Sequence, residues 1–428
     1  MRVLVRLALR NLVAHKTKSL IVGSIIAFGV IVLVAGVSFM QTASLGLRRS
    51  FIESFTGDVI ISGKAAAPVS LFGVQSMGGT ETTPEMPRFQ DVMAHVRAQP
   101  GVKGVTSQIT GANQINIEGN DSANVDSLVF LFGIEPESYQ AMFDSVDLMS
   151  GRFLLPGEQG ILLSAQQIES LDRELKTRLT VGSTVIIQNF GTAIRAVTVR
   201  GIYTYKRSSA ALSMICYIDA ASLRALEGMS PSSWHYVIVT LKNPADAPRF
   251  IAETNKWLSA NGIEAAAGGW QRAAGPFATI PSLIRILLVA AILVVSVVAM
   301  IIIMNTLVAS VIERTSEIGT MRALGAKKGF VWRMFFIETL TISILFGLIG
   351  TGIGAALVAA LNALGIPASN TLLQLLVGGP VLRPVVSVSA LGASVIVFFT
   401  IGVIAHLYPV AVALRIPPIR AIRTGQNE

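Results

Sequence analysis

NTLVASVIERTSEIGTMRALGAKKGFVWRMFFIETL, residues 305–340, joins one long apolar run of the chain to another. Ile318, Met321 and Leu324 are spaced as one apolar helical face, and Gly325 suits a left-handed helix end. The segment therefore predicts a short amphipathic helix and link at 313–338, held between two membrane-length segments. A plain loop would need neither the helical face nor the mixed charge of Glu313, Arg314, Glu317, Arg322, Lys327, Lys328, Arg333 and Glu338.

The composition indicates a membrane protein without an active site. Of the 428 residues, 52% are hydrophobic and 14% are charged, whereas a soluble domain has about 25% charged residues. The single cysteine, Cys216, excludes an intrachain disulfide and a multi-cysteine metal site. The four histidines have no partner at ligand spacing, and no G-x-S-x-G, H-E-x-x-H or G-x-x-x-x-G-K-[ST] motif occurs. We therefore expect no catalytic residue, cofactor or metal in this chain, and an enzyme is the least favoured class.

Four uncharged runs are long enough to cross a bilayer, which takes about 20 helical residues at about 1.5 Å each. Lys and Arg are concentrated in residues 1–18, 313–338 and 415–428, whereas the link 365–384 carries only Arg383. By the positive-inside rule, both termini and the 313–338 link are cytoplasmic. The expected transmembrane helices are 19–47, 285–312, 339–364 and 385–414.

The net charge of +9 is unevenly distributed. Of 34 Lys+Arg and 25 Asp+Glu, 20 and 21 lie from Arg48 to Arg285, which leaves 14 and 4 in the rest. A basic pI often indicates a nucleic-acid partner, but here the basic residues flank apolar spans, so we expect a membrane and no nucleic acid. Arg2, Arg6 and Arg10 recur every fourth residue, which predicts an amphipathic helix on the inner leaflet, near anionic lipid headgroups.

Residues 48–284 are long enough for one or two compact extracytoplasmic subdomains. A strand–helix–strand pattern recurs at about 48–111 and 230–270, and a mainly β insertion is expected between them at about 112–229. The expected fold is an α-helical membrane protein with four transmembrane helices and a large α+β extracytoplasmic domain between the first two. Residues 64–87 have no clear period and are either a contact tip or a mobile insertion. Their apolar residues include Leu71, Phe72 and Met77.

Several segments resemble the MacB/LolC–LolE/FtsX-type, or type VII, ABC transporter permeases. ERTSEIGTMRALGAKKGFV, which begins at Glu313, and the following FFIETL resemble their coupling segment, and Glu338 matches the acidic residue that commonly opens the next span. LALRNLVAHKTKSL (7–20) resembles their N-terminal helix, SGRFLLPGEQGILLSAQ (150–166) their MacB-like periplasmic core domain, and PPIRAIR (417–423) their C-terminal ending. The residues that match the coupling pattern in order and spacing are Glu313, Arg314, Thr315, Glu317, Ile318, Gly319, Arg322, Gly325 and Ala326.

The resemblance implies a dimeric permease driven by separate ATPase subunits. Two permease chains, identical or paralogous, would assemble in the cytoplasmic (inner) membrane with two ABC ATPase subunits, in which ATP and Mg bind. Closure of the ATPase pair would move the coupling helices, and the spans would pass this motion to the outside domains by mechanotransmission. The residues implied in ATPase coupling are Glu313, Arg314, Glu317, Gly319, Arg322, Gly325 and Ala326.

Within this family, the large, nearly neutral outside domain favours lipoprotein release, or export of a hydrophobic or peptide-like substrate. A lipoprotein or periplasmic protein is then a further partner, together with membrane lipid. The alternatives are MacB-like efflux, FtsX-like regulation of cell-wall hydrolases, and a non-transporting membrane scaffold or receptor. The candidate lining of a substrate path, near the outer end of the first span, is Phe39, Met40, Leu45, Phe51 and Phe55.

Overall fold

The computed structural model describes residues 10, 16–74, 83–116, 128–175, 178–189, 193–206, 214–313 and 315–369, and then 373–374, 377, 379–386, 391–392, 395–397, 399–401 and 403–404. The chain divides into two compact units. The helical unit comprises Met1–Thr42, Leu283–Ile366 and Arg383–Glu428, and the sheet unit comprises Ala43–Ser282 and Pro367–Leu382. The divisions at Thr42 and Ser282 fall inside two continuous helices, α2 (Lys16–Phe51) and α9 (Ile280–Glu313).

The sheet unit is built on a ten-stranded sheet in the order β12-β1-β11-β4-β5-β10-β7-β9-β6, with β8 paired to β4 and β9. Its strands are β1 (Val59–Gly63), β4 (Val102–Asn116), β5 (Leu128–Ile134), β6 (Val146–Gly151), β7 (Gly160–Ser164), β8 (Thr184–Asn189), β9 (Ile194–Tyr205), β10 (Ile215–Asp219), β11 (Tyr236–Leu241) and β12 (Ala265–Gly269). The helices are α3 (Phe89–Arg97), α4 (Pro136–Met142), α5 (Ala165–Leu175), α6 (Ala220–Glu227), α7 (Ala247–Ala260) and α8 (Trp270–Ala274). Two smaller sheets pair β2 (Val69–Ser70) with β3 (Gly73–Val74), and β13 (Ile366–Pro367) with β14 (Val381–Leu382).

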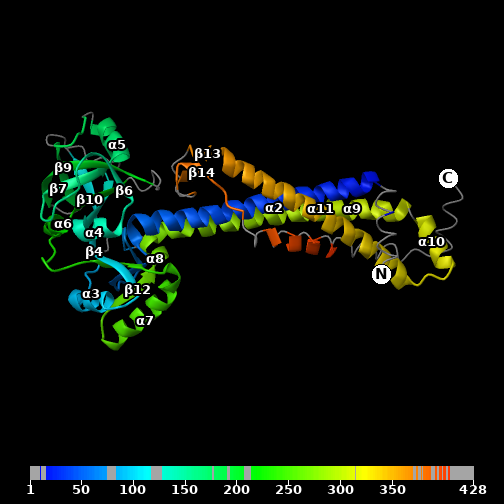
Figure 1. Ribbon diagram of the computed structural model, residues 1–428, viewed down its shortest axis with the longest axis horizontal. Coiled ribbons are helices and arrows are strands. Elements are labelled where there is room, and N and C mark those ends of the chain that lie inside the picture. The colour runs from blue at the N-terminus through cyan, green and yellow to red at the C-terminus, as the bar shows by residue number, and fades with distance from the viewer. Residues whose placement is uncertain are drawn as a thin grey trace. The chain divides into compact units, whose positions relative to one another are not determined.

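The first and last strand–helix–strand segments meet at one end of this sheet (Figure 1). The first segment supplies β1, α3 and β4, and the last supplies β11, α7 and β12. β1 pairs antiparallel with both β11 and β12, and β11 pairs antiparallel with β4. Val59, Ile61, Val237 and Val239 belong to a hydrophobic cluster with residues of α3 and α7. The alternate residues of β1 and β11 therefore face the opposite side of the sheet, because side chains alternate along a strand.

Residues 112–229 form no separate β domain among the described residues, because their strands continue the same sheet. β4 pairs antiparallel with β5 and, over its last residues, with β8, while β5 pairs parallel with β10. Among the described residues, this segment also contains the helices α4, α5 and α6 beside its strands. In α5 and α6 the buried apolar residues recur at helical spacing, as Ile168 with Leu171 and Leu223 with Leu226 do.

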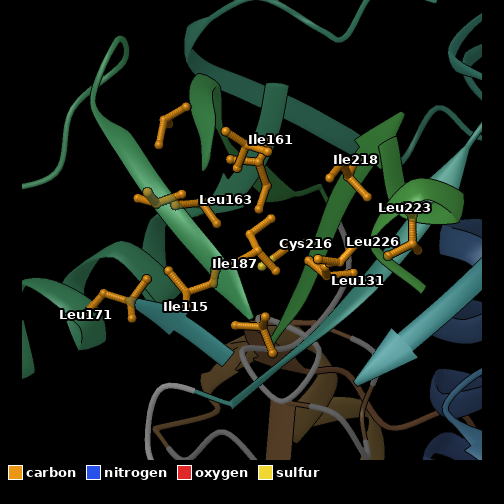
Figure 2. Packing of buried hydrophobic residues seen from close by; sticks show 14 of the residues in the cluster. Ile115, Leu131, Ile161, Leu163, Leu171, Ile187, Cys216, Ile218, Leu223 and Leu226 are labelled. Carbon is orange, nitrogen blue, oxygen red and sulfur yellow. The ribbon is translucent and has the colours of Figure 1, made fainter. Parts of the chain in front are cut away.

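A second hydrophobic cluster holds the middle of the sheet unit together. Figure 2 shows Cys216 of β10 close to Ile187 of β8 and Leu226 of α6. Cys216 and Ile187 are fully buried, and Leu226 is nearly so. Burial raises the pKa of the Cys216 thiol above its ordinary value, so this cysteine is a packing residue rather than a reactive thiol.

Three described helices are long and apolar enough to cross a membrane: Ser19–Thr56, Phe277–Glu313 and Lys328–Leu364. They correspond to the first three expected spans, but each extends beyond its uncharged run. Arg48 and Arg49 lie inside α2, Arg285 lies inside α9, and α11 (Lys328–Leu364) begins well before residue 339. Charged residues limit the part of a helix that can lie in the hydrocarbon core, but they do not end the helix itself.

The other membrane predictions fall largely on residues that the structure does not describe. In the expected fourth span, 385–414, only scattered residues up to 404 are described, so a count of four spans stays a prediction. In the expected amphipathic helix, 1–18, the described residues are 10 and 16–18.

Within the helical unit, α2, α9 and α11 pack through one hydrophobic cluster that includes Ile26, Ile303 and Ile342, and they run along one another in Figure 1. Small residues bring α2 and α11 close together. A Cβ atom on Gly350 would lie 2.6 Å from the carbonyl oxygen of Ala27, and one on Gly354 would lie 3.1 Å from Cβ of Val34. The Gly350-x-x-x-Gly354 spacing therefore marks a close helix–helix contact.

Candidate functional site

The link between α9 and α11 is a compact element with its own small core. It contains α10 (Thr315–Ala323), the turn that follows, and the beginning of α11. Ile318 of α10 is 4% exposed and packs with Val331, Met334 and Phe335 of α11 and with Val311 of α9. We call this set, with the half-buried Met321, the coupling core. One core therefore joins α10 to the end of α9 and the beginning of α11.

α10 ends in a Schellman motif that requires a glycine. Gly325 has φ +98°, a conformation that L-residues with a side chain rarely adopt. The N–H of Ala326 donates to the carbonyl of Met321 at 3.0 Å, and the N–H of Gly325 donates to that of Arg322 at 3.2 Å. Lys327 then takes an extended conformation as the N-cap residue of α11. The glycine predicted to end the helix therefore does so, and it sets a sharp turn between α10 and α11.

Leu324 differs from its prediction. It was expected to continue the apolar face of Ile318 and Met321, but it is 85% exposed. Steps of three residues fall short of one helical turn, so Leu324 points about 120° away from Ile318. Leu324 also follows the last residue of α10, Ala323. A large, nearly fully exposed apolar side chain beside the exposed Lys327 is suited to contact with another protein.

The other predicted coupling residues are distributed around this element. Gly319 is buried, Ala326 is half-buried, and Arg322 is half-buried with a side-chain interaction. Glu313 is exposed and also has an interaction partner. Glu317 lies in α10 but its side chain is not described, and Arg314 lies outside the described residues.

The predicted substrate-path residues fall into two groups. Phe39 and Met40 of α2 are half-buried and Leu45 is 43% exposed. Phe51 and Phe55, in contrast, are fully buried in the sheet unit. A fully buried ring cannot line an accessible path, so this part of the prediction does not hold for the conformation described. Sequence spacing did not reveal it, because the rings that cover Phe51 and Phe55 come from distant segments.

The titratable groups of the sheet unit form no candidate active site in the described part of the chain. Within that part, no group of three or more His, Cys, Asp or Glu side chains is arranged to hold a metal ion. His235 is 5% exposed, and burial lowers its pKa to about 4. Its Nδ1 accepts a hydrogen bond from the backbone N–H of Thr110 at 3.2 Å. This histidine is therefore neutral at physiological pH and serves packing.

Family comparisons agree with this architecture. A family model described as MacB-like periplasmic core domain matches residues 19–256, which is more than half of the chain. A second, described as FtsX-like permease C-terminal, matches residues 289–418. The chain belongs to the ABC transporter permeases of the MacB and FtsX type. It is thus a membrane permease family member with a periplasmic core domain.

Two curated relatives show how far the likeness extends. The chain is 33% identical to the uncharacterized ABC transporter permease YknZ of Bacillus subtilis over 121 residues, 28% of this chain and 27% of that protein. It is 23% identical over 364 residues to the macrolide export ATP-binding/permease protein MacB of Neisseria gonorrhoeae, 83% of this chain and 53% of that protein. The chain therefore spans about half the length of this MacB.

Among solved structures, the periplasmic region of MacB from Actinobacillus actinomycetemcomitans aligns with 52% of this chain and 94% of that one. The sequence identity is 14% and the TM-score is 0.35. A TM-score this low does not establish a shared fold. Family membership therefore follows from the two family models.

Proposed function

We propose that this chain is the permease subunit of an ABC transporter whose ATPase subunits lie in separate chains and bind ATP and Mg. In this proposal α10 and the turn after it dock on an ATPase subunit in the cytoplasm. Movement of that subunit displaces the coupling core, and α2 and α9 carry the displacement to the sheet unit on the outer side of the inner membrane. Two copies of the chain, or this chain and a paralogue, form the complex.

The observation that carries the proposal is the coupling core. A link that only reverses the chain direction needs no buried contacts of its own, whereas Ile318 is held among side chains from α9 and α11. The same element exposes Leu324 next to basic residues. Interface anchors are typically exposed apolar side chains surrounded by polar ones, so Leu324 is the residue we assign to the ATPase contact.

Co-purification tests this assignment. The full chain is expressed with candidate ATPase subunits from its own genome, and retention of each subunit is scored in detergent. We expect Leu324→Glu, Glu317→Lys and Arg322→Glu to lose an ATPase that the wild type retains. Leu155→Glu is the matched control, because Leu155 is 55% exposed but lies in the sheet unit. A folded wild type that retains no ATPase would favour the membrane scaffold or receptor instead.

For the substrate, we propose lipoprotein release or export of a hydrophobic or peptide-like molecule, for which the large, nearly neutral sheet unit is suited. MacB-like efflux is the second candidate, favoured by the match to a protein named for macrolide export over 83% of this chain. Lipoprotein release and macrolide efflux predict different effects when the chain is depleted. Depletion of the chain should leave labelled lipoproteins in the inner membrane in the first case, and should raise macrolide susceptibility alone in the second.

A further inference from the structure

Seven aromatic rings meet inside the sheet unit, on the side of the sheet opposite α3 and α7. They come from four places: the end of α2 with the π-helical turn η1 (Ile52–Thr56), the β2–β3 turn, strand β5, and the segment from α8 through the 3₁₀ helix η5 (Gly275–Thr279) that precedes α9. We call them the aromatic joint. Its members are Phe51, Phe55, Phe72, Phe130, Phe132, Trp270 and Phe277.

Phe72 has the most contacts in the joint. Its ring centroid lies 6.1 Å from that of Phe55 in η1 and 5.1 Å from that of Phe277 in η5. It also lies 5.2 Å from Phe130 and 6.0 Å from Phe132, both in β5. Phe72 therefore touches the segment at the end of α2, the segment at the start of α9 and the sheet at once. We call Phe51–Thr56 and Gly275–Thr279 the two root segments.

Without Phe72, the two root segments lose the ring that bridges Phe55 and Phe277. The remaining ring contact between them joins Phe51 to Phe277 at a centroid distance of 5.9 Å. Phe277 then has no ring contact with the sheet among the described residues, whereas Phe55 keeps its contact with Phe132 at 5.9 Å. Each aromatic pair contributes about 0.5–1.5 kcal/mol beyond simple burial. The contacts of Phe72 therefore matter most for the root segment of α9.

The β2–β3 hairpin that carries Phe72 is docked by polar contacts as well. The hydroxyl of Tyr236 donates to the carbonyl of Ser70 at 2.6 Å, and the N–H of Leu71 donates to the carbonyl of Ala273 at 2.9 Å. Leu71 is fully buried, and Gly73 takes φ +98° in the turn. Residues 69–74 are thus held by contacts inside the sheet unit, while Met77 lies outside the described residues, and the two alternatives for 64–87 stay predictions.

Gln108 is a buried polar residue on the face of the sheet that carries Tyr236. Gln108 of β4 lies opposite Tyr236 in register and is fully buried, yet neither its Nε2 nor its Oε1 has a partner in the described structure. Directly opposite residues of antiparallel strands point to the same side, so Gln108 shares the face that Tyr236 presents to the hairpin. A buried amide without partners is unfavourable, so Gln108 is a destabilising polar group on this face of the sheet.

We propose that Phe72 is a positioning residue that ties both root segments to β5, so that α2 and α9 act on the sheet together. The role of Phe72 in transport rests on the proposed function. The connection of both root segments to β5 through Phe72 does not depend on an ATPase. If the hairpin is released, the Phe51–Phe277 contact still joins the two root segments, but the root segment of α9 loses its ring connection to β5 through Phe72.

Hydrogen exchange of the full chain in nanodiscs, without nucleotide, tests whether Phe72 connects both root segments to β5. In Phe72→Ala we expect amide exchange to rise by roughly tenfold in both root segments, the effect of losing about one aromatic pair in each. Phe89→Ala is the matched control, because Phe89 stacks on Trp234 at 5.6 Å outside the joint. It should leave both root segments unchanged. An increase confined to residues 69–74, or to one root segment, would overturn the proposal.

A milder variant keeps the test valid if Phe72→Ala does not fold. Phe72→Leu retains an apolar side chain but no ring, and we expect it to raise exchange in both root segments by a smaller factor. Unchanged exchange in both segments would overturn the proposal.

The role in transport needs the complex with its ATPase and trapped nucleotide. Nucleotide should alter exchange in both root segments of the wild type, and in Phe72→Ala this joint response should be lost while ATP hydrolysis continues. An equal response in the wild type and Phe72→Ala would overturn the role of Phe72. A wild type that shows no nucleotide response contradicts the proposed function instead. The nucleotide-free exchange experiment still tests whether Phe72 connects both root segments to β5.

Discussion

The backbone of Ala27 in α2 occupies the space that a side chain on Gly350 in α11 would need. A Cβ atom at Gly350 would lie 2.6 Å from the carbonyl oxygen of Ala27 and 2.9 Å from its Cα. The obstructing atoms belong to a helix backbone, so they cannot move aside as a flexible side chain would. This contact sets how closely the two helices approach within the helical unit.

We therefore expect Gly350→Ala to destabilise the helical unit by about 1–3 kcal/mol, the usual cost of overpacking. The measurement is the thermal midpoint of the purified chain in detergent. Gly352→Ala is the control on the same helix, because a Cβ atom there meets nothing within 4 Å. Equal midpoints for the two variants would contradict the close contact.

The left-handed turn at Gly325 gives a second prediction. Gly325→Ala places a side chain at φ +98° and should weaken the turn by about 1 kcal/mol. We expect reduced retention of the ATPase, because the direction in which Leu324 points depends on this turn. Gly329→Ala is the matched control in the first turn of α11, where an added Cβ meets nothing within 4 Å and the helical propensity rises. If Gly325→Ala retains the ATPase as well as Gly329→Ala does, the turn does not set the docking geometry.

Glu158 links two arginines in the sheet unit. Its Oε2 accepts a hydrogen bond from Nη1 of Arg152 at 2.8 Å, and its Oε1 forms an ion pair with Nε of Arg200 at 2.8 Å without hydrogen-bond geometry. The hydrogen bond from Arg152 is the main cause that lowers the pKa of Glu158 below its ordinary value. The stabilisation is thus complete above the pKa of an unfolded glutamate, about 4.3, and is lost as the pH falls through the lower, folded value.

Glu158→Gln should therefore lower the thermal midpoint of the sheet unit modestly at pH 7, and the difference from the wild type should shrink below about pH 4. Glu169→Gln is the control, because Glu169 and Arg173 form a pair in which both side chains are at least 75% exposed. A pH-independent difference for Glu158→Gln would show that its effect is not electrostatic.

His235 also loses stability as the pH falls, but over a higher pH range than Glu158. Its folded pKa of about 4 lies below its ordinary value of 6.5, so the unfolded chain binds the proton first as the pH falls. The stability is complete above about pH 6.5 and should decrease by about 2 kcal/mol between pH 7 and pH 5. His235→Asn keeps an acceptor for the N–H of Thr110 and should flatten this slope. Chemical unfolding at a series of pH values measures it, and an unchanged slope would assign the pH dependence to other groups.

Local features of the fold could be predicted from the sequence because they depend on neighbouring residues. The periods of the strand–helix–strand segments are visible in Tyr236–Leu241 and in the helix that follows. The helix end at Gly325 follows from its lack of a side chain. The ends of the membrane helices were less predictable, because charged residues such as Arg48 lie inside α2 rather than at its end.

The candidate site was predictable in position but not in orientation. Sequence spacing placed Ile318, Met321 and Leu324 on one face, and only the first two take part in the coupling core. Whether an apolar residue is exposed depends on which segments pack against it, and the rotation of the helix decides this.

The sequence by itself determined three apolar helices of membrane length, the alternating strands and the capped amphipathic link, because periodicity and chain geometry act over a few residues. Only the tertiary structure decided that Phe51, Phe55 and Phe72 lie in one aromatic joint with Phe277. It also decided that the strands of the middle segment join one continuous sheet. The physical reason is that burial and strand pairing are contacts between distant segments, and a local pattern of residues does not specify the partner.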